Sequence, residues 1–165
     1  MTSEHLLHTI PPIYDRNSKI LILGSFPSVK SREVSFYYGH PQNRFWRVLA
    51  AVLGCAVPSA KEEKTALLQS HNIALWDIIK SCDIVGSSDS SIKNVVPNDI
   101  GTILSSCGIR QIYSNGKTSE KLFNKYIKDT VGRDTVALPS TSPANASYNL
   151  ERLTDSWSVI KNNIR

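Results

Sequence analysis

The sequence Ile20-Leu21-Ile22-Leu23-Gly24-Ser25-Phe26-Pro27-Ser28 joins a short apolar run to a glycine and a polar loop. An uninterrupted apolar run of this length is typical of a strand that is buried on both faces, as in a parallel sheet. The loop continues to Gln42 and is rich in Gly, Pro, Ser, His, Tyr and Asn. Because α/β proteins place their chemistry in loops at the carboxyl ends of buried strands, this stretch predicts an active site.

Short apolar segments alternate with segments of helical periodicity along the rest of the chain. The expected strands are residues 19–23, 73–76, 110–113 and 135–138, and the expected helices are residues 44–53, 59–70, 99–107, 118–128 and, from 147 or 149, up to 164. This alternation predicts a three-layer α/β/α sandwich on a four-stranded parallel sheet, as a single domain over residues 1–165. Right-handed crossovers bring the carboxyl ends of all four strands to one edge, so the loops that follow them should converge.

Two segments are expected to lie outside this pattern. Residues 1–15 are interpreted as a surface segment that leads to the first strand, with no secretory signal pattern. Residues 78–97 are polar and lack a clear period, so they are predicted to be an irregular loop, either functional or a solvated linker.

The composition narrows the class of protein. The 165 residues include 19 Lys and Arg against 14 Asp and Glu, a balance that suits a polyanionic partner, although mildly basic proteins without such a partner are common. The three cysteines are widely spaced and no nucleotide-binding glycine motif is present, so neither a metal nor a cofactor is expected. The odd cysteine count suggests reduced thiols and a cytoplasmic location, and no apolar run is long enough to cross a membrane.

Two motifs carry a resemblance to a known family. The first combines Gly24-Ser25-Phe26-Pro27-Ser28 with His40-Pro41-Gln42-Asn43-Arg44-Phe45-Trp46, and the second is Pro139-Ser140-Thr141-Ser142-Pro143-Ala144-Asn145 before a final amphipathic helix. Together they resemble the uracil-DNA glycosylase superfamily over essentially the whole chain, and most of all its hypoxanthine-DNA glycosylase branch. The resemblance implies a uracil-DNA glycosylase-like fold and an enzyme that flips a deaminated base out of DNA and hydrolyses its N-glycosidic bond. Hypoxanthine is the first expected base, with uracil and xanthine as alternatives, and an abasic site without strand cleavage is the expected product.

The sequence departs from the wider superfamily at two positions. Much of the superfamily has Asp or Asn, which positions the attacking water, where this chain has Phe26, and many members have His or Asn where it has Leu138. The branch that it resembles shows the same loss, and there Asn43 matches the residue assigned to catalysis. An amide can donate to a base or orient a water without changing its protonation. Asn43 is therefore expected to be catalytic, and a plain N-cap of the next helix is the alternative interpretation.

The other candidate site residues come from the four converging loops. Those expected to bind the base are Gly24, Ser25, Phe26, Tyr38, His40, Asp77 and Asn115. Those expected to bind DNA are Ser28, Lys117, Ser140, Ser142, Pro143, Ala144 and Asn145. Lys30, Arg32 and Arg44 are further candidates for backbone contacts, or are simply solvated.

Each of these assignments has a chemical reason. Asp77 could accept from the N1–H of hypoxanthine, or cap a turn. Phe26 is the best placed aromatic residue for stacking on a flipped base, and one of Tyr37 and Tyr38 is expected to be structural. Pro143, Ala144 and Asn145 could enter the minor groove and fill the vacated stack, or form an ordinary loop.

The expected partner is double-stranded DNA that contains a deaminated base, with single-stranded DNA as an alternative substrate and a monomer as the expected state. Two other functions remain open from sequence alone. One is a noncatalytic damaged-DNA-binding module that has lost its water-positioning residue, and the other is a hydrolase of free nucleosides. A base-release assay on DNA and on free nucleosides separates the three.

Overall fold

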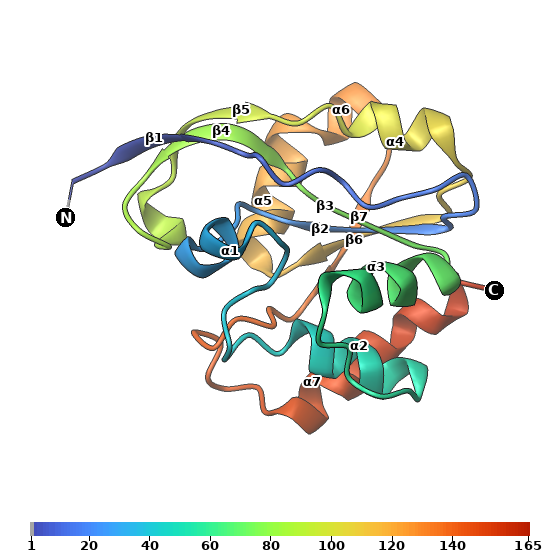
Figure 1. The fold of residues 1–165 in the computed structure, drawn as a ribbon. Helices are drawn as coiled ribbons and strands as arrows, with labels where there is room; N and C mark the ends of the chain where they lie inside the picture. Colours follow the sequence, from blue (N-terminus) through green and yellow to red (C-terminus); the bar gives the residue numbers. More distant parts are fainter. Residues whose placement is uncertain (1) are drawn as a thin grey trace.

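A four-stranded parallel sheet forms the centre of the molecule (Figure 1). The computed structural model describes residues 2–165. The sheet has the order β3-β2-β6-β7, made of β2 (Ile20–Gly24), β3 (Ile73–Asp77), β6 (Gln111–Asn115) and β7 (Thr135–Leu138). Every residue of β2 is buried, as its uninterrupted apolar run predicts. The parallel register pairs Gly24 with Asp77, which sets the ends of β2 and β3 side by side.

Helices cover both faces of this sheet, which confirms the predicted three layers (Figure 1). Ile20 and Ile22 face a core shared with helices on one side, and Leu21 and Leu23 face a second core on the other. The helices of the first side are α2 (Phe45–Leu53), α3 (Lys61–Ser70) and α7 (Leu150–Trp157), and those of the second are α4 (Ile100–Ser106), α5 (Lys117–Tyr126) and α6 (Lys128–Val131). A short 3-10 helix, Ser158–Asn162, continues α7.

The prediction of an irregular loop over residues 78–97 was wrong. The segment forms β4 (Ile79–Ile84), a 3-10 turn at Asp89–Ser91 and β5 (Lys93–Pro97). These two strands join β1 (Glu4–Leu7) in an antiparallel sheet of order β1-β4-β5. Register shifts between β4 and β5 break the period of two that identifies a strand in a sequence. The apolar residues Ile79, Cys82 and Ile84 nevertheless bury a small core of their own.

The interpretation of residues 1–15 as a surface segment was wrong in part: residues 2–7 are mostly exposed but include a strand, and Met1 lies outside the described residues. Strand β1 pairs with β4 along its whole length. Farther along, Ile10 and Ile13 are 3% and 7% exposed, and Ile13 bridges to Leu75 of β3. Most side chains of β1 are exposed, so the strand carries no apolar pattern that a sequence could reveal.

The loop between the two halves of the first motif contains one more helix, α1 (Val29–Val34). Six residues are too few to show a helical period, so this helix could not be predicted. The chain then returns through Gly39, where a β-carbon would lie 2.6 Å from Cγ2 of Val34. Glycine at this position therefore lets the returning chain pack closely against α1.

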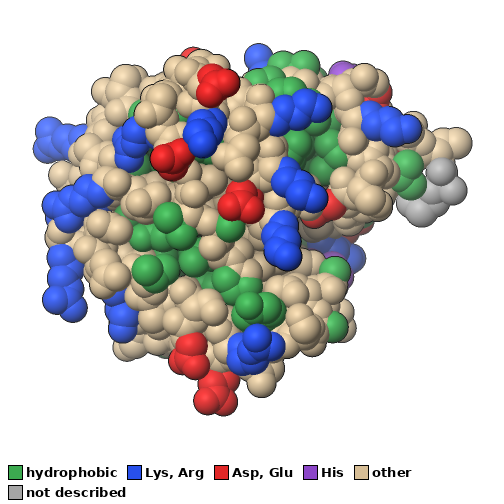
Figure 2. Space-filling view, turned by 180° about the vertical axis from the view of Figure 1, so that it is seen from behind, with side chains coloured by type: hydrophobic (Ala, Val, Ile, Leu, Met, Phe, Trp, Pro, Cys, Tyr) green, Lys and Arg blue, Asp and Glu red, His purple; other side chains and the backbone are tan. Residues whose placement is uncertain are grey.

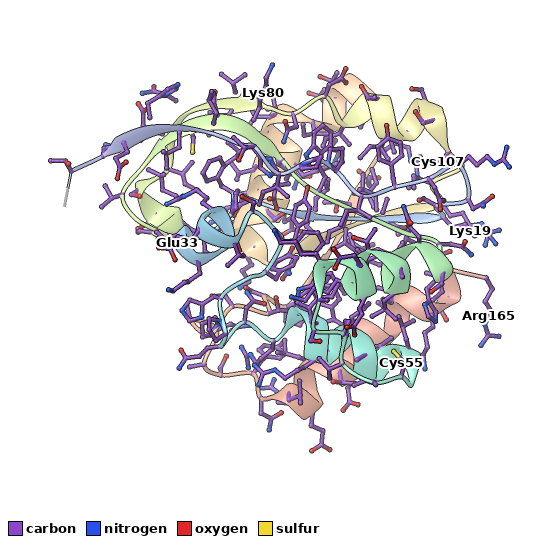
Figure 3. All side chains as sticks on the ribbon, in the orientation of Figure 1. Lys19, Glu33, Cys55, Lys80, Cys107 and Arg165 are labelled. Atoms are coloured by element: carbon purple, nitrogen blue, oxygen red, sulfur yellow. The ribbon has the colours of Figure 1, made fainter. Side chains whose placement is uncertain are left out.

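The three cysteines are free thiols. Figure 3 shows Cys55 after α2 and Cys107 after α4, on opposite sides of the parallel sheet. No helix within residues 2–165 combines the length and the apolar character that crossing a bilayer requires.

Candidate active site

A pocket of about 570 Å³ opens at the edge where the parallel strands end. Its volume is in the range of sites that take a small ligand. The loops after β2, β3, β6 and β7 all contribute to it, as right-handed crossovers predict. The predicted site residues that line it are Gly24, Ser25, Phe26, Ser28, Tyr38, His40, Asn43, Asp77, Asn115, Ser140, Ser142, Pro143 and Ala144. Lys117 and Asn145 lie outside the lining.

The side-chain amide of Asn43 is held by its oxygen. Oδ1 accepts from the backbone N–H of Phe45 at 2.9 Å and from the hydroxyl of Thr141 at 2.9 Å. Because a backbone N–H can only donate, the amide must turn its oxygen toward the protein. No hydrogen bond within residues 2–165 engages Nδ2. Asn43 therefore presents an N–H donor at the pocket that it lines.

Thr141 connects the two amides of the site. Its hydroxyl accepts from Nδ2 of Asn115 at 3.1 Å and donates to Asn43, while its backbone N–H donates to Oδ1 of Asn115 at 3.1 Å. The residue is fully buried. Sequence analysis named its neighbours Ser140 and Ser142 but missed Thr141, although its place in the middle of the second motif was an available signal.

Asn43 contributes to the start of α2 and also lines the pocket, and its catalytic role stays a prediction. Arg44 occupies the N-cap position of α2 and makes no side-chain cap. Asn43, one residue earlier, still accepts from the first N–H of the helix at Phe45. The same contact that satisfies the helix end therefore fixes the orientation of the amide.

Arg44 binds protein rather than standing free for DNA. Its guanidinium donates to the carbonyl oxygens of Ser142 at 2.8 Å, Asn145 at 3.1 Å and Tyr148. Its backbone N–H donates to the carbonyl of Thr141 at 3.0 Å. Arg44 thus fastens the first motif to the second, and its expected contact with the DNA backbone is replaced by this structural role.

Asp77 lies at the floor of the pocket and is bound by a residue from the N-terminal segment. His8 Nε2 donates to its Oδ2 at 2.8 Å, and the His8 and Asp77 side chains are only 2% and 6% exposed. The buried Asn98 donates to the carbonyls of Asp77 and Ile79. Oδ2 of Asp77 is therefore engaged by His8. The predicted contact between Asp77 and a base stays a prediction, and it would use Oδ1.

The aromatic residues of the first motif have separate tasks. The hydroxyl of Tyr37 donates to the carbonyls of Pro11 and Ile10, so Tyr37 is the structural tyrosine of the pair. The ring of Tyr38 stacks on Phe45, with centroids 4.2 Å apart and planes 18° from parallel. Phe26 is partly exposed at the pocket wall, where the Arg32 guanidinium lies 5.7 Å from its ring centroid.

Gly24 permits a close approach at the pocket floor. A β-carbon at this position would overlap Oδ1 of Asp77 and lie 3.0 Å from the hydroxyl of Tyr38. Burial raises the pKa of Tyr38 far above its ordinary value, and the negative charge of Asp77 adds to the rise, while Asn115 opposes it. The Tyr38 side chain is therefore a neutral phenol at physiological pH.

The loop of the second motif is organised by its own side chains. Ser140 Oγ accepts from the N–H of Ser142 at 3.1 Å, and Ser142 Oγ accepts from the N–H of Ala144 at 3.2 Å. Asn145 donates to the carbonyl of Ser140 at 3.0 Å. Pro143 and Ala144 remain exposed at the tip. The loop is a preformed projection beside the pocket, as a wedge into DNA would require.

Two other predicted residues have hydroxyl or ring atoms that already serve the fold. Ser28 Oγ accepts from the N–H of Ser31 at 3.2 Å and so caps α1. His40 Nδ1 accepts from the N–H of Gln42 at 3.1 Å. Lys117 is the exposed first residue of α5. Contacts of these residues with DNA or with a base stay predictions.

Sequence analysis missed one carboxylate of the pocket lining, Asp89. The residue lies in the 3-10 turn between β4 and β5 and is exposed overall. Partial burial of its carboxyl group against the pocket wall raises its pKa, and hydrogen bonding to Thr118 and Ser25 opposes the rise. Within residues 2–165, no group of three or more His, Cys, Asp or Glu side chains is arranged to hold a metal ion.

Comparison with known proteins gives consistent results. The model of the Uracil DNA glycosylase superfamily matches residues 11–162. A hypoxanthine DNA glycosylase of Methanosarcina acetivorans is 34% identical over 152 residues, which cover 91% of this chain and 94% of that protein. A hypoxanthine DNA glycosylase of Methanosarcina barkeri is 34% identical over 137 residues, or 82% of this chain and 85% of that one. The solution NMR structure of a candidate uracil DNA glycosylase from Methanosarcina acetivorans is similar with a TM-score of 0.79 at 33% identity, covering 93% of this chain and 95% of that chain.

Proposed function

Because this chain belongs to the uracil-DNA glycosylase superfamily and is a DNA N-glycosylase, we propose that it excises hypoxanthine from DNA, with uracil and xanthine as alternative bases. The family and the enzyme class predicted from the two motifs are thereby confirmed. The choice of hypoxanthine is supported by the names of the two relatives at 34% identity. The product is an abasic site in an intact strand.

The observation that carries the mechanism is the orientation of the Asn43 amide. Breaking the bond between the base and C1′ leaves positive charge on the sugar, while the base departs with the electron pair. A fixed N–H donor at the base stabilises the negative charge that develops on its carbonyl or ring nitrogen. Since the Asn43 oxygen is held by Phe45 and Thr141, the group available to the base is the Nδ2 donor. We therefore assign Asn43 to stabilisation of the leaving base.

A water molecule completes the reaction by bonding to C1′ and losing a proton, and the departing base takes up a proton. Phe26 stands where much of the superfamily carries a water-positioning residue, so stabilisation of the leaving base bears more of the catalysis in this chain. No lysine within residues 2–165 lines the pocket, which supports hydrolysis rather than a covalent Schiff-base intermediate and strand cleavage.

The target base must leave the duplex to reach a pocket at the sheet edge, at a cost of a few kcal/mol of stacking and pairing. The exposed Pro143 and Ala144 at the tip of the second-motif loop are placed to fill the vacated stack. Lys and Arg side chains are spread over the face in Figure 2 rather than gathered in one patch. Double-stranded DNA is the proposed substrate form, bound by a monomer through these loops, with Lys117 as one phosphate contact.

The test is release of base from matched duplexes that carry deoxyinosine, uracil or xanthine, followed by alkali to cleave abasic sites. The same bases in single strands, and free inosine, complete the panel. Asn43→Ala should lower the single-turnover rate on deoxyinosine by roughly 100-fold or more, the scale of losing one donor to a developing charge. Asn124→Ala, an exposed asparagine on α5, is the matched control and should retain the wild-type rate.

Three results would contradict the proposal. Absence of abasic product on every DNA substrate, with salt-dependent binding retained, would make the chain a binding module. Cleavage of free inosine without any gain from DNA would make it a nucleoside hydrolase. An Asn43→Ala rate equal to that of wild type would remove the assigned role of Asn43 alone.

A further inference from the structure

The hydroxyl of Tyr38 has no hydrogen-bond partner within residues 2–165, although the oxygen is completely buried. The neighbouring Tyr37 is different, since its hydroxyl donates to the carbonyl of Pro11 at 2.9 Å. A buried polar group without a partner costs stability, and such groups are rare in folded proteins. The unpartnered Tyr38 hydroxyl therefore requires an explanation that Tyr37 does not.

Tyr38 is held firmly in this position. Its backbone has φ of +53°, the left-handed region that a bulky residue seldom adopts. Its ring stacks on Phe45, and its hydroxyl lies against Gly24, the last residue of β2. Strained residues that the surrounding structure holds in place tend to cluster at functional sites. Because Tyr38 also lines the pocket, a ligand that enters the pocket is the natural partner of its hydroxyl.

Nearby side chains leave this hydroxyl free to donate. Oδ1 of Asn115 accepts from the backbone N–H of Thr141 and is not free to accept from this hydroxyl. Asp77 is bound by His8 through Oδ2, and its charge, together with burial, keeps the phenol in its protonated form. The pocket floor therefore offers one neutral O–H donor, the Tyr38 hydroxyl, in addition to the N–H donor of Asn43.

The chemistry of deamination suggests what this donor meets. Deamination replaces an exocyclic amino group, which donates, with a carbonyl oxygen, which accepts. Resting on the proposed function, we propose that the Tyr38 hydroxyl donates a hydrogen bond to the carbonyl that deamination creates on the flipped base, which is O6 in hypoxanthine. Tyr38 is then a base-recognition residue through its hydroxyl, in addition to the stacking of its ring.

The test substitutes Tyr38→Phe, which keeps the ring and its stacking on Phe45 and removes only the oxygen. The single-turnover rate of hypoxanthine release from duplex DNA should fall by roughly 10- to 100-fold, the scale of a hydrogen bond to a group that gains charge. The melting temperature should stay unchanged or rise, because a desolvated group without a partner is removed. Tyr37→Phe, by contrast, removes a hydroxyl that donates to the carbonyl of Pro11, and this variant should melt at a lower temperature than wild type. Tyr126→Phe, on α5 outside the pocket lining, should keep the wild-type rate.

The outcomes separate this inference from the proposed function. A wild-type protein that releases no base overturns both. An active wild type with a Tyr38→Phe variant of equal rate overturns the inference and leaves the proposed function intact. A Tyr38→Phe variant that melts as early as Tyr37→Phe shows a structural hydroxyl, which also overturns it. A slow variant of undiminished stability supports it.

Discussion

Substitution of Thr141 by valine tests how the second motif positions the amide of Asn43, the proposed catalytic group. Valine keeps the shape of threonine and removes the hydroxyl that accepts from Asn115 and donates to Asn43. Each lost hydrogen bond is worth about 0.5–1.5 kcal/mol, so the free energy of unfolding should fall by about 1–3 kcal/mol. For a chain of this size, the melting temperature should then fall by roughly 2–12 °C.

The effect on activity follows from the freedom that Asn43 gains. With Thr141→Val, the Asn43 oxygen keeps only the backbone N–H of Phe45, and the amide can turn away from the base. A misplacement on the order of 1 Å costs about 100-fold in rate, so kcat should fall by roughly 10- to 100-fold while KM changes little. Base release from deoxyinosine duplexes and thermal unfolding are measured on the same preparations.

Two controls make the result decisive. Thr154→Val removes a hydroxyl on α7 that contacts only the carbonyl of Leu150, and it should leave kcat unchanged. Thr141→Ser retains the hydroxyl and should recover most of the wild-type rate. If Thr141→Val melts at a lower temperature but turns over at the wild-type kcat, then Thr141 supports the loop without positioning Asn43, and the reasoning is refuted.

The remaining predictions concern the floor and the wall of the pocket. Gly24→Ala places a methyl group against Asp77 and the Tyr38 hydroxyl, so the free energy of unfolding measured in urea should fall by about 1–3 kcal/mol and base release should be reduced. In the control Gly108→Ala the methyl group meets open space, and neither quantity should change. Equal stabilities of the two glycine variants would contradict the packing described for β2. The pKa of Asp89 is higher in the folded state than in the unfolded chain, where it is about 3.9. The protonated carboxyl therefore favours folding at pH values below about 3.9, and this stabilisation is lost as the pH rises through the folded-state pKa. Asp89→Asn should therefore be more stable than wild type at pH 7 and lose that advantage near pH 3, and an advantage of equal size at both values would show that charge is not its cause.

The sequence predicted the parallel sheet because its strands are buried on both faces and so are uninterrupted apolar runs. Residues Ile20 to Leu23 are the clearest case, since each is fully buried. The antiparallel strands β1 and β4 were missed for the opposite reason. Most of β1 is exposed, and register shifts interrupt the pairing of β4 with β5, so neither segment shows the period of two that identifies a strand.

The candidate site was predictable where topology alone places a residue, as for Asp77 and Asn115 at the ends of β3 and β6, whereas Asn43 was predicted from the resemblance of its motif. It was not predictable where a contact joins distant parts of the chain. The bond between His8 and Asp77 spans 69 residues, and a sequence offers no rule by which to pair them. The partner of Asn98, likewise, is visible only in the structure, where its side chain donates to the backbone carbonyl of Asp77.

The bonds from Arg44 to the second motif have a consequence for biosynthesis. Arg44 and Ser142 are 98 residues apart, and the carbonyl of Tyr148 completes the set. A chain leaves the ribosome from its N-terminus, so β2, α2 and the first motif emerge long before these acceptors exist. The pocket closes only after β7 has joined the sheet and the second motif has followed it out. The set of contacts that joins the two motifs is therefore complete only once the second motif has been translated, and we expect a chain truncated before Pro139 to release no base.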